Sequence, residues 1–495
     1  MRLSRRALLV VLAALLSLTG LGLPAAIAAD GPAANPCTEP DAGLNPACLP
    51  EGTAGQMLRQ ACDYRWVDEA CASTRLPDPG YAATADPSPG QPLVQRVGAV
   101  HEHSSYSDGS PPSIPRDYFQ AGRTGQNGNG TGVQLDFMLS SEHSDNTQIP
   151  ITTAPSCLDP AGALACAQLT SNQQYWKWPA TLRQAEEASD ATFTAARGFE
   201  WTNDYFNHMN VYFSRNFRNV KIDGSYLSMG VMWDWLQRPA DQGGGDDGLV
   251  TFNHPGGNPA LSPFDGDLPH NQLLGQLGNG NWDDLAYVPQ VDDRVAGMEV
   301  KGGDDLEWYV KALTKGWHIG AVGQEDEAEG KWASSADAKT LMLTRGRSPR
   351  DYYFALQNQR TVSVVDALVS GAPSTRAEVP TISFYANGKS VQDPKATLLG
   401  SAIERRGRQR LVFEAAGLPA GSRVALVSDT GAPVQLGAVS PDGTVKASAV
   451  RLSPVSGEDW YFAVVCPASV GSSCGADQSF LAVTAPIWLR APGAD

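Results

Sequence analysis

Short apolar runs, each about the length of one β-strand, recur through the middle of this 495-residue chain and alternate with stretches of helical character. The expected strands are residues 93–100, 133–139, 191–197, 208–213, 248–252, 296–300 and 318–322. The expected helices are residues 179–189, 229–236, 305–315 and 348–360. Strands that alternate with helices are typical of βα units. The sequence therefore predicts an α/β fold built on a largely parallel sheet.

Histidine and acidic residues stand just after these apolar runs. The stretches that follow five of the runs are His101-Glu102-His103, Ser140-Ser141-Glu142-His143, Gly198-Phe199-Glu200, Asn253-His254-Pro255 and Gly323-Gln324-Glu325-Asp326-Glu327. In barrels and open α/β sheets, side chains just past the carboxyl ends of strands converge on one site. The chain has seven histidines, and five of them fall in this set once His208 is included. We therefore expect these side chains to form one site.

The motif with the clearest geometry is His101-x-His103, which Asp108 follows. Side chains at positions i and i+2 of a strand point to the same face, so both imidazoles can reach one cation. Asp108 lies in a turn-like stretch that can return its carboxylate to the same place. His208 either opens a strand or caps a strand edge. His318 begins its strand, so we expect it at the opposite mouth.

A mixture of imidazole and carboxylate ligands suits zinc, manganese or iron, whereas calcium prefers oxygen ligands alone. A carboxylate such as that of Glu200 can bridge two ions. Two ions about 3.5–4 Å apart hold a hydroxide at neutral pH and bind both the entering and the leaving oxygens of a hydrolysis. This chemistry serves phosphate esters, and equally carboxyl esters and amides. No nucleophile elbow, phosphate loop or dinucleotide fingerprint competes with it in the sequence.

The charge balance excludes one large class of partner. The chain carries 37 Lys and Arg against 53 Asp and Glu, which gives a net charge of -16. Proteins that bind nucleic acid through its phosphates use clustered Lys and Arg, and the sequence contains no such cluster. We therefore expect no nucleic-acid partner and a small-molecule ester as the substrate.

Residues 1–29 have the features of an export signal. Arg5 and Arg6 precede an apolar run over residues 7–16, and small residues follow over 24–29. A basic start, a short apolar stretch and a small-residue cleavage site are typical of a secretory signal, and this run is short for a membrane span. The paired arginines also fit twin-arginine export. We predict a secreted protein, extracellular or associated with the cell envelope, without a stable membrane anchor.

Eight cysteines agree with export, because an even number of cysteines in an exported chain favours disulfides. They form four couples that are close in sequence, namely Cys37/Cys48, Cys62/Cys71, Cys157/Cys166 and Cys466/Cys474. None of these couples has the CxxC spacing of a zinc knuckle. We expect disulfides between neighbours, although eight cysteines permit about 105 connectivities.

The composition of the chain and its pattern of apolar residues change near residues 92 and 367. Residues 30–92 are rich in Pro, Gly and Ala, and we expect an N-terminal arm that disulfides staple. The βα pattern occupies residues 93–367. Residues 368–495 contain short β-like runs at 381–385, 410–415, 423–428, 447–452, 460–465 and 480–489, separated by Gly, Pro and Asp turns. This last pattern predicts a small C-terminal β-sandwich.

A set of short motifs resembles one known family. In chain order these are His101-x-His103-Ser104, Ser107-Asp108-Gly109, Glu142-His143, Gly198-x-Glu200, His208, Asn253-His254-Pro255 and Gly323-x-x-Asp326. Together they resemble the polymerase and histidinol phosphatase (PHP) superfamily. The exported branch related to carbaryl hydrolase is the most similar, because its C-terminal part ends much like residues 482–489. The resemblance covers residues 93–490 and implies a distorted (β/α)7 barrel, similar to a TIM barrel, with two or three divalent metal ions.

The resemblance also implies the ligands of each ion. His101, His103, Glu200 and Asp326 would hold the first ion, Glu200, His208 and His254 the second, and Asp108 and His143 a third. The family usually closes with a Ser-Asp-x-His run, where this chain has Gln324-Glu325-Asp326-Glu327. Either Glu325 or Asp326 is then the ligand. Either Glu327 replaces the missing imidazole or the third ion is absent.

Three functions follow from these features. The favoured one is a phosphoesterase, in which a metal-bridging hydroxide held by Glu200, His254 and Asp326 attacks phosphorus. The second is a carboxyl-ester, carbamate or amide hydrolase that uses the same metals, as the similarity to carbaryl hydrolase implies. The third is a non-catalytic scaffold that binds a metal or another ligand. The candidate cations for a substrate phosphate are Arg197, Lys301 and Arg345, which form no cluster in the sequence.

Overall fold

The computed structural model describes residues 78–493 apart from residues 105, 110–112, 145–176, 223–224, 256–280, 405, 430–431 and 477. The expected signal and most of the expected N-terminal arm therefore lie outside the described residues. So do six cysteines, namely Cys37, Cys48, Cys62, Cys71, Cys157 and Cys166. No helix within the described ranges is long and apolar enough to cross a membrane.

Most strands belong to three sheets. The large sheet contains, in spatial order, β16 (Ala402–Ile403), β23 (Ile487–Arg490), β21 (Glu458–Cys466), β22 (Ala482–Thr484), β13 (Thr361–Val364), β12 (Lys339–Thr344), β1 (Val94–Ala99), β2 (Phe137–Leu139) and β4 (Thr194–Ala196), with β18 (Arg423–Ser428) and β19 (Val434–Ala438) attached through β21. The site sheet contains β11 (Gly320–Val322), β10 (Val295–Glu299), β9 (Leu249–Phe252), β6 (Met209–Tyr212), β5 (Gly198–Trp201) and β3 (Glu142–His143). The C-terminal sheet contains β15 (Thr397–Leu398), β14 (Thr381–Ala386), β17 (Arg408–Ala416) and β20 (Thr444–Leu452). A separate pair consists of β7 (Lys221–Ile222) and β8 (Ser225–Tyr226).

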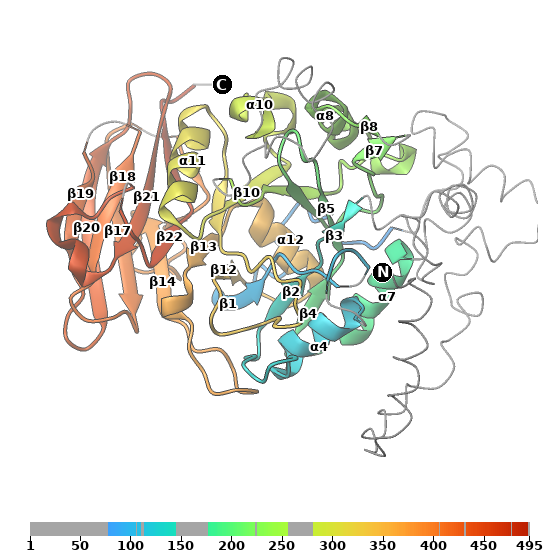
Figure 1. The fold of residues 1–495 in the computed structure, drawn as a ribbon. Coiled ribbons are helices and arrows are strands. Elements are labelled where there is room, and N and C mark those ends of the chain that lie inside the picture. The colour runs from blue at the N-terminus through green and yellow to red at the C-terminus, as the bar shows by residue number, and fades with distance from the viewer. Residues whose placement is uncertain are drawn as a thin grey trace, which may run out of the picture.

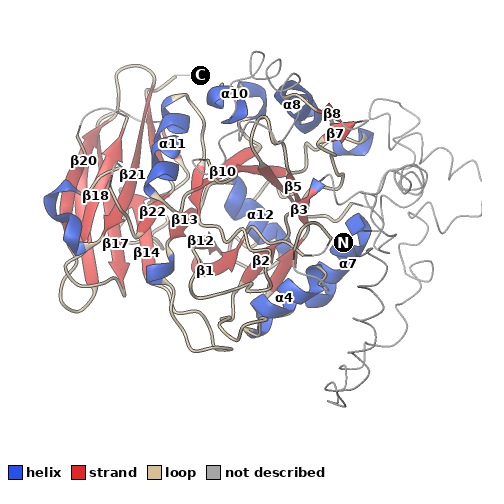
Figure 2. Ribbon diagram, in the orientation of Figure 1, coloured by secondary structure: helices blue, strands red, loops and turns tan. Residues whose placement is uncertain are grey.

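Helices are fewer and lie around the sheets, as Figure 2 shows. They are α4 (Pro115–Thr124), α7 (Lys177–Ala188), α8 (Met229–Gln237), α10 (Asn281–Leu285), α11 (Gly303–Thr314) and α12 (Pro349–Gln357), with short 3-10 turns η4 (Ala240–Gln242), η5 (Pro289–Val291), η6 (Asp366–Leu368) and η7 (Ala468–Ser473). The four predicted helices correspond to α7, α8, α11 and α12. The sequence analysis missed α4, although Pro115 in its first turn and left-handed Gly125 at its end are standard boundary signals.

The start of α12 shows how local sequence determines an element. The Ser348 hydroxyl accepts a hydrogen bond from the Asp351 backbone N–H at 3.3 Å, and the Asp351 carboxylate accepts one from the Ser348 N–H at 2.9 Å. Pro349 occupies the first helical position, where no backbone N–H is required. This reciprocal capping satisfies donors that the first helical turn otherwise leaves free.

The expectation of a largely parallel sheet is wrong, because the sheets are mixed. Strands β1, β2 and β4 run parallel, and β9, β10 and β11 do so as well. Strand β6, however, runs antiparallel to both β5 and β9, and β12 runs antiparallel to both β1 and β13. Residues 202–208 link β5 to β6, and such a short link permits a hairpin but no crossover to a parallel neighbour.

The large sheet and the site sheet are connected in two places. Strands β2 and β4 of the large sheet lead directly into β3 and β5 of the site sheet. On the other side, Glu102, after β1, forms a parallel bridge with Glu327, after β11, and His103 N–H donates to the Glu327 carbonyl at 3.0 Å. The result is a mixed α/β protein with large sheets, whose strands do not close into one barrel within the described residues.

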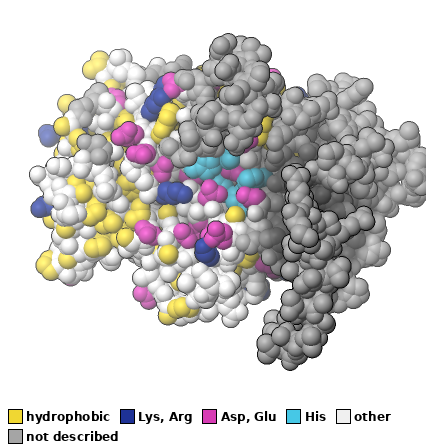
Figure 3. Space-filling view, in the orientation of Figure 1, with side chains coloured by type: hydrophobic (Ala, Val, Ile, Leu, Met, Phe, Trp, Pro, Cys, Tyr) yellow, Lys and Arg dark blue, Asp and Glu magenta, His cyan; other side chains and the backbone are white. Residues whose placement is uncertain are grey.

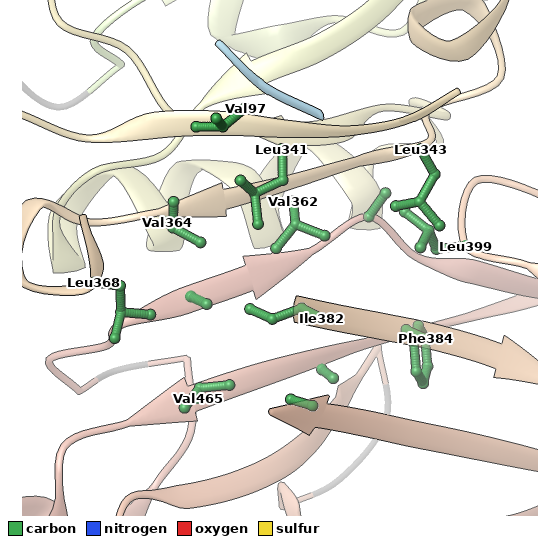
Figure 4. Close-up of a cluster of buried hydrophobic side chains, with 14 of the residues drawn as sticks. Val97, Leu341, Leu343, Val362, Val364, Leu368, Ile382, Phe384, Leu399 and Val465 are labelled. Atoms are coloured by element: carbon green, nitrogen blue, oxygen red, sulfur yellow. The ribbon is translucent and has the colours of Figure 1, made fainter. Parts of the chain in front are cut away.

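The large sheet and the C-terminal sheet pack face to face around one apolar core. Figure 4 shows Leu341 and Val362 of the large sheet in the same cluster as Ile382 and Phe384 of β14, and all four side chains are buried. Figure 1 shows the C-terminal strands, in orange and red, gathered on one side of the molecule. Because β22 pairs with β13, the large sheet continues unbroken into the C-terminal region. The boundary between two domains near residue 367 stays a prediction.

One face of the site sheet is apolar, and the other carries polar side chains beside apolar ones such as Tyr212 and Leu249. Phe199 and Trp201 belong to an apolar core that also contains Met209 and Phe252. Side chains alternate between the two faces of a strand, so Glu200, between Phe199 and Trp201, points to the opposite face. The same alternation on β6, β9 and β10 places Asn210, Thr251 and Glu299 on that polar face, beneath the candidate site.

Candidate metal centre

The carboxylate of Glu200 lies at the centre of four imidazoles. Its Oε1 lies 3.1 Å from His208 Nδ1, 3.2 Å from His101 Nε2 and 3.4 Å from His254 Nε2. Its Oε2 lies 3.2 Å from His143 Nε2. Glu200 itself is only 1% exposed. Four segments distant in sequence therefore bring their imidazoles to one buried carboxylate.

Strand direction explains how His208 reaches this group. His208 directly precedes β6, so it opens a strand instead of following one. Because β6 is antiparallel to β5 and β9, its first residue Met209 pairs with Trp201 and Phe252, the last residues of those strands. His208 thus lies at the edge where β5 and β9 end. Glu200 was expected just past a strand, and the structure instead places it within β5.

Asp326 and Asp108 extend the group on the side of His103. Asp326 Oδ1 lies 3.3 Å from His103 Nε2 and 3.5 Å from His101 Nε2. Asp108 Oδ1 lies 3.7 Å from His103 Nδ1 and 3.8 Å from His143 Nε2. All eight residues that the sequence analysis named as ligands are therefore brought together.

Three subsets of these residues have donor atoms close enough to share a cation. They are His101, His103 and Glu200; Glu200, His208 and His254; and His103, Asp108 and His143, each with ligand atoms within 4.8 Å of one another. Glu200 belongs to two of the subsets. One subset equals the second ligand set that the family resemblance implies. The subset with His101 has the residues of the first implied set except Asp326, and the subset with Asp108 has the two residues of the third together with His103.

The spacing of the donor atoms fits the ligand spacing of a metal ion. The Nε2 atoms of His101, His103 and His208 are buried and make no oriented hydrogen bond within the described residues. In a tetrahedral site with bonds of about 2.0–2.1 Å, ligand atoms lie roughly 3.3–3.4 Å apart. The distances from Glu200 Oε1 to its imidazoles, 3.1 to 3.4 Å, match that spacing.

Glu325 and Glu327, the alternatives to Asp326, have other partners. The Glu325 carboxylate lies 2.5 Å from the Lys339 ammonium and accepts a hydrogen bond from the Ala333 N–H at 3.0 Å. The Glu327 carboxylate accepts a hydrogen bond from the Lys331 N–H at 3.2 Å and so closes a turn. Asp326 is thus the acidic residue of this segment that faces the imidazoles. His318 lies outside the cluster, beside Asp292, as expected.

Sequence reasoning missed Glu299 and Asn253, which hold the candidate ligands in place. Glu299 Oε1 lies 2.6 Å from His101 Nδ1, and its Oε2 accepts from the His254 N–H at 2.7 Å. Asn253 donates to Glu200 Oε1 at 2.9 Å. Glu299 lies inside the expected strand 296–300, one residue before its end, so a search for residues just past the strand ends did not find it.

A second chain of contacts orients His103. Its Nδ1 lies 3.3 Å from the Ser107 hydroxyl, and that hydroxyl donates to Glu142 Oε2 at 2.6 Å. The Glu142 carboxylate also accepts from the Ser104 N–H at 3.1 Å. Because the Ser107 hydroxyl donates its proton to Glu142, its contact with His103 requires a proton on His103 Nδ1. In the neutral imidazole the other nitrogen, Nε2, then carries no proton and is available to a cation.

The charges of the cluster shift the pKa values of its members in opposite directions. Burial alone raises the pKa of the Glu200 carboxyl, but His208 and His101 outweigh it and hold that pKa well below its usual range. Burial alone lowers the pKa of His208, but Glu200 and Asp204 outweigh it and raise that pKa to about 10. Without a cation, protons on His101 and His208, whose pKa values the nearby carboxylates raise, balance part of the charge of those carboxylates. Metal uptake would displace such protons.

Two of the candidate ligands have a strained backbone. His254 has a φ of 31° and Asp326 a φ of 53°, and Asn207, just before His208, has a φ of 71°. A positive φ is uncommon in residues other than glycine. Such conformations cluster at functional sites, where the surrounding structure holds them in place.

An open pocket of about 420 Å³ lies over the cluster. Its described lining consists of Asp108, His143, Glu200, His208, His254, Lys301, Asp305 and Asp326. Figure 3 shows histidine and acidic side chains gathered on this face of the molecule, with Lys or Arg side chains beside them. Candidate ligands that line this pocket, including His143, His208, His254 and Asp326, are partly exposed in it. Sequence reasoning did not name Asp305 as part of this site.

Comparison with known proteins gives distant likenesses to solved structures. No family model matches the chain, and no curated protein matches it. One similar structure is a two-domain protein from Bacteroides vulgatus, described as containing a predicted PHP-like metal-dependent phosphoesterase. Its identity to this chain is 15% and the TM-score is 0.37, and the match covers 80% of this chain and 95% of that one. Another is PsfC from Pseudomonas syringae, with 11% identity, a TM-score of 0.31, and coverage of 55% and 91%. Likenesses this distant carry no argument, so the function rests on the side chains of the site.

Proposed function

We propose that this protein is a secreted metal-dependent hydrolase that cleaves phosphate esters. The single observation that carries the proposal is the buried carboxylate of Glu200 among the imidazoles of His101, His143, His208 and His254. A buried carboxylate shared by several imidazoles is a typical arrangement for a site that holds more than one divalent ion. On the evidence of the sequence motifs, we also propose that the protein belongs to the exported branch of the PHP superfamily. We propose that its fold is the distorted (β/α)7 barrel of that family.

Two ligand sets follow from this arrangement, with zinc, manganese or iron as the candidate ions. His101, His103, Glu200 and Asp326 would hold one ion, and Glu200, His208 and His254 would hold another. Asp108 and His143 are the proposed ligands of a third. Divalent ions in such a site lower the pKa of water and stabilise the charge that develops on a phosphoryl group. Glu299 and Ser107 keep the Nδ1 atoms of His101 and His103 engaged, so that both rings present Nε2.

Secretion is part of the proposal. The export signal of residues 1–29 supports it, and so does the disulfide between Cys466 and Cys474. Disulfides persist in oxidising compartments and are rare in the cytosol. Mass spectrometry of the mature protein from culture medium tests the cleavage near residue 29.

The test of the function combines metal content with a substrate panel. We would measure zinc, manganese and iron in the purified mature protein by elemental analysis. We would then assay p-nitrophenyl phosphate, bis(p-nitrophenyl) phosphate and p-nitrophenyl acetate with and without a chelator. The proposal expects at least two metal equivalents and phosphate-ester cleavage that the chelator abolishes. Acetate cleavage alone would indicate a carboxyl-ester hydrolase, and neither metal nor turnover would indicate a binding scaffold.

Variants test the ligand assignment separately. Glu200→Gln and His254→Ala should each lose metal and activity, because each removes a donor from the shared group. Glu307→Gln, an exposed carboxylate on α11, is the matched control and should keep both. Full metal content and full activity in either ligand variant would contradict the assignment.

A further inference from the structure

The pocket over the candidate metal centre contains one cation among its described lining residues, Lys301. The other charged side chains of that lining are acidic or are imidazoles. Lys301 follows β10 and stands two residues after Glu299. Lys301 lies in the bend between β10 and α11. Its position in the lining of the pocket places it at the same mouth as Glu200, His254 and Asp326.

The ammonium of Lys301 is exposed and has no ion-pair partner among the residues that the structure describes. Its neighbour in the pocket, Asp305, is already engaged. Asp305 Oδ2 accepts hydrogen bonds from the backbone N–H groups of Lys301 at 3.0 Å and Gly302 at 2.9 Å. Asp305 therefore determines the path of the backbone here, and the lysine side chain remains available to a ligand.

The other two candidate cations for a substrate phosphate, Arg197 and Arg345, have partners elsewhere in the protein. Arg197 is buried, stacks on Trp178 at 3.8 Å and donates to backbone carbonyls, including that of Ser214 at 3.1 Å. Arg345 pairs with Asp86 at 3.0 Å. Neither residue belongs to the described lining of the pocket. Lys301 is thus the candidate cation that faces the site.

We propose that Lys301 binds an anionic oxygen of the substrate and so selects anionic phosphate esters over neutral carboxyl esters and carbamates. This inference rests on the proposed function and names the substrate class of the same site. Charge-assisted hydrogen bonds to phosphate oxygens are stronger than neutral ones. Lys301 discriminates by the charge of the substrate, because its ammonium binds an anionic oxygen more strongly than the neutral carbonyl oxygen of an ester.

The test compares substrates that share one leaving group and differ in charge. We would measure KM and kcat of wild type, Lys301→Met and Lys301→Arg with p-nitrophenyl phosphate, bis(p-nitrophenyl) phosphate and p-nitrophenyl acetate. Lys301→Met should raise KM for p-nitrophenyl phosphate about tenfold, as expected for loss of one charged hydrogen bond. Its KM for the acetate should not change, and Lys301→Arg should recover most of the phosphate binding. Lys395→Met, an exposed lysine after β14, is the matched control and should behave as wild type.

A binding measurement keeps the two proposals separate. Calorimetric titration of inorganic phosphate into the metal-loaded protein requires no turnover, and Lys301→Met should weaken that binding about tenfold. Equal phosphate affinity in both proteins, or an equal loss on all three substrates, would overturn the role of Lys301 alone. Hydrolysis of the acetate without any hydrolysis of the phosphates would overturn both the selection by charge and the proposed phosphoesterase function. Absence of metal and of all turnover in wild type would instead contradict the proposed function.

Discussion

Glu299 Oε1 lies 2.6 Å from His101 Nδ1, while Glu299 Oε2 accepts a hydrogen bond from the backbone N–H of His254 at 2.7 Å. One buried carboxylate therefore holds a residue from each of the two proposed ligand sets. With Nδ1 engaged, His101 presents Nε2 to Glu200 and Asp326. Carboxylates in this position orient a ligand imidazole and raise its basicity.

Replacement of this carboxylate should weaken metal binding without removing a ligand. We expect Glu299→Gln to lower metal affinity by roughly 10- to 100-fold, because the amide orients His101 less strongly and leaves its imidazole less basic. Competition with a chromophoric chelator measures the affinity. Activity should return when metal is added in excess. Glu307→Gln provides the control, and unchanged affinity in Glu299→Gln would refute the role of Glu299.

A histidine remote from the metal centre should make stability depend on pH. His318 Nδ1 lies 2.5 Å from Asp292, and its Nε2 lies 2.8 Å from Glu458. Burial alone lowers the pKa of His318, but Asp292 and Glu458 outweigh it and raise that pKa to about 9. In the unfolded chain a histidine has a pKa of about 6.5. Protonated His318 therefore stabilises the fold fully below about pH 6.5, and this contribution is lost as the pH rises through about 9.

The matching experiment is thermal unfolding of wild type and His318→Gln between pH 5.5 and 10. The difference in unfolding free energy should be largest at the acidic end, at most roughly 3 kcal/mol, and should vanish above about pH 9. Titrations shared by both proteins cancel in the difference. A difference that stays constant with pH would show that the imidazolium charge contributes nothing.

The core between the large sheet and the C-terminal sheet should be sensitive to truncation. Leu341 is fully buried in the cluster of Figure 4, so Leu341→Ala leaves a cavity as well as losing apolar burial. We expect a loss of about 2–5 kcal/mol in the free energy of unfolding, measured by denaturant titration. Val455 is 99% exposed, and Val455→Ala should change stability by less than about 0.5 kcal/mol. Equal effects of the two substitutions would contradict this packing.

The disulfide between Cys466 and Cys474 joins the end of β21 to residues eight positions further on. Removal of a cross-link over so short a loop should cost about 2–3 kcal/mol. The variant Cys466→Ala/Cys474→Ala tests this without leaving a free thiol, and its melting temperature should fall. Peptide mapping under non-reducing conditions checks the pairing in wild type. An unchanged melting temperature would mean that the surrounding core holds this loop without the cross-link.

Local sequence predicted many elements correctly where the local signal was strong. The start of α12 carries its own capping residues, so the helix was identifiable from Ser348 and Pro349 alone. The apolar run before His101 predicted β1, and the run before Asn253 predicted β9. These elements depend on neighbours in the chain, which a sequence displays directly.

The direction of each strand relative to its neighbours was harder to predict from the sequence. The hairpin of β5 and β6 reverses part of the expected parallel sheet, and it places Glu200 inside a strand. An apolar run indicates a strand but does not state which neighbour it pairs with. That choice depends on the length of the connection and on the packing of Phe199 and Met209 in the core beneath.

The sequence by itself determined the kinds of donor available for a site: five histidines and a few carboxylates, most of them beside apolar runs. Only the tertiary structure decided that Asp326 faces the imidazoles while Glu325 turns to Lys339. It alone also brought Glu299 beside His101, and Lys301 into the pocket over Glu200 and His254. The physical reason is that donor chemistry belongs to each residue, whereas distances between donors depend on sheet pairing and burial between segments far apart in the chain.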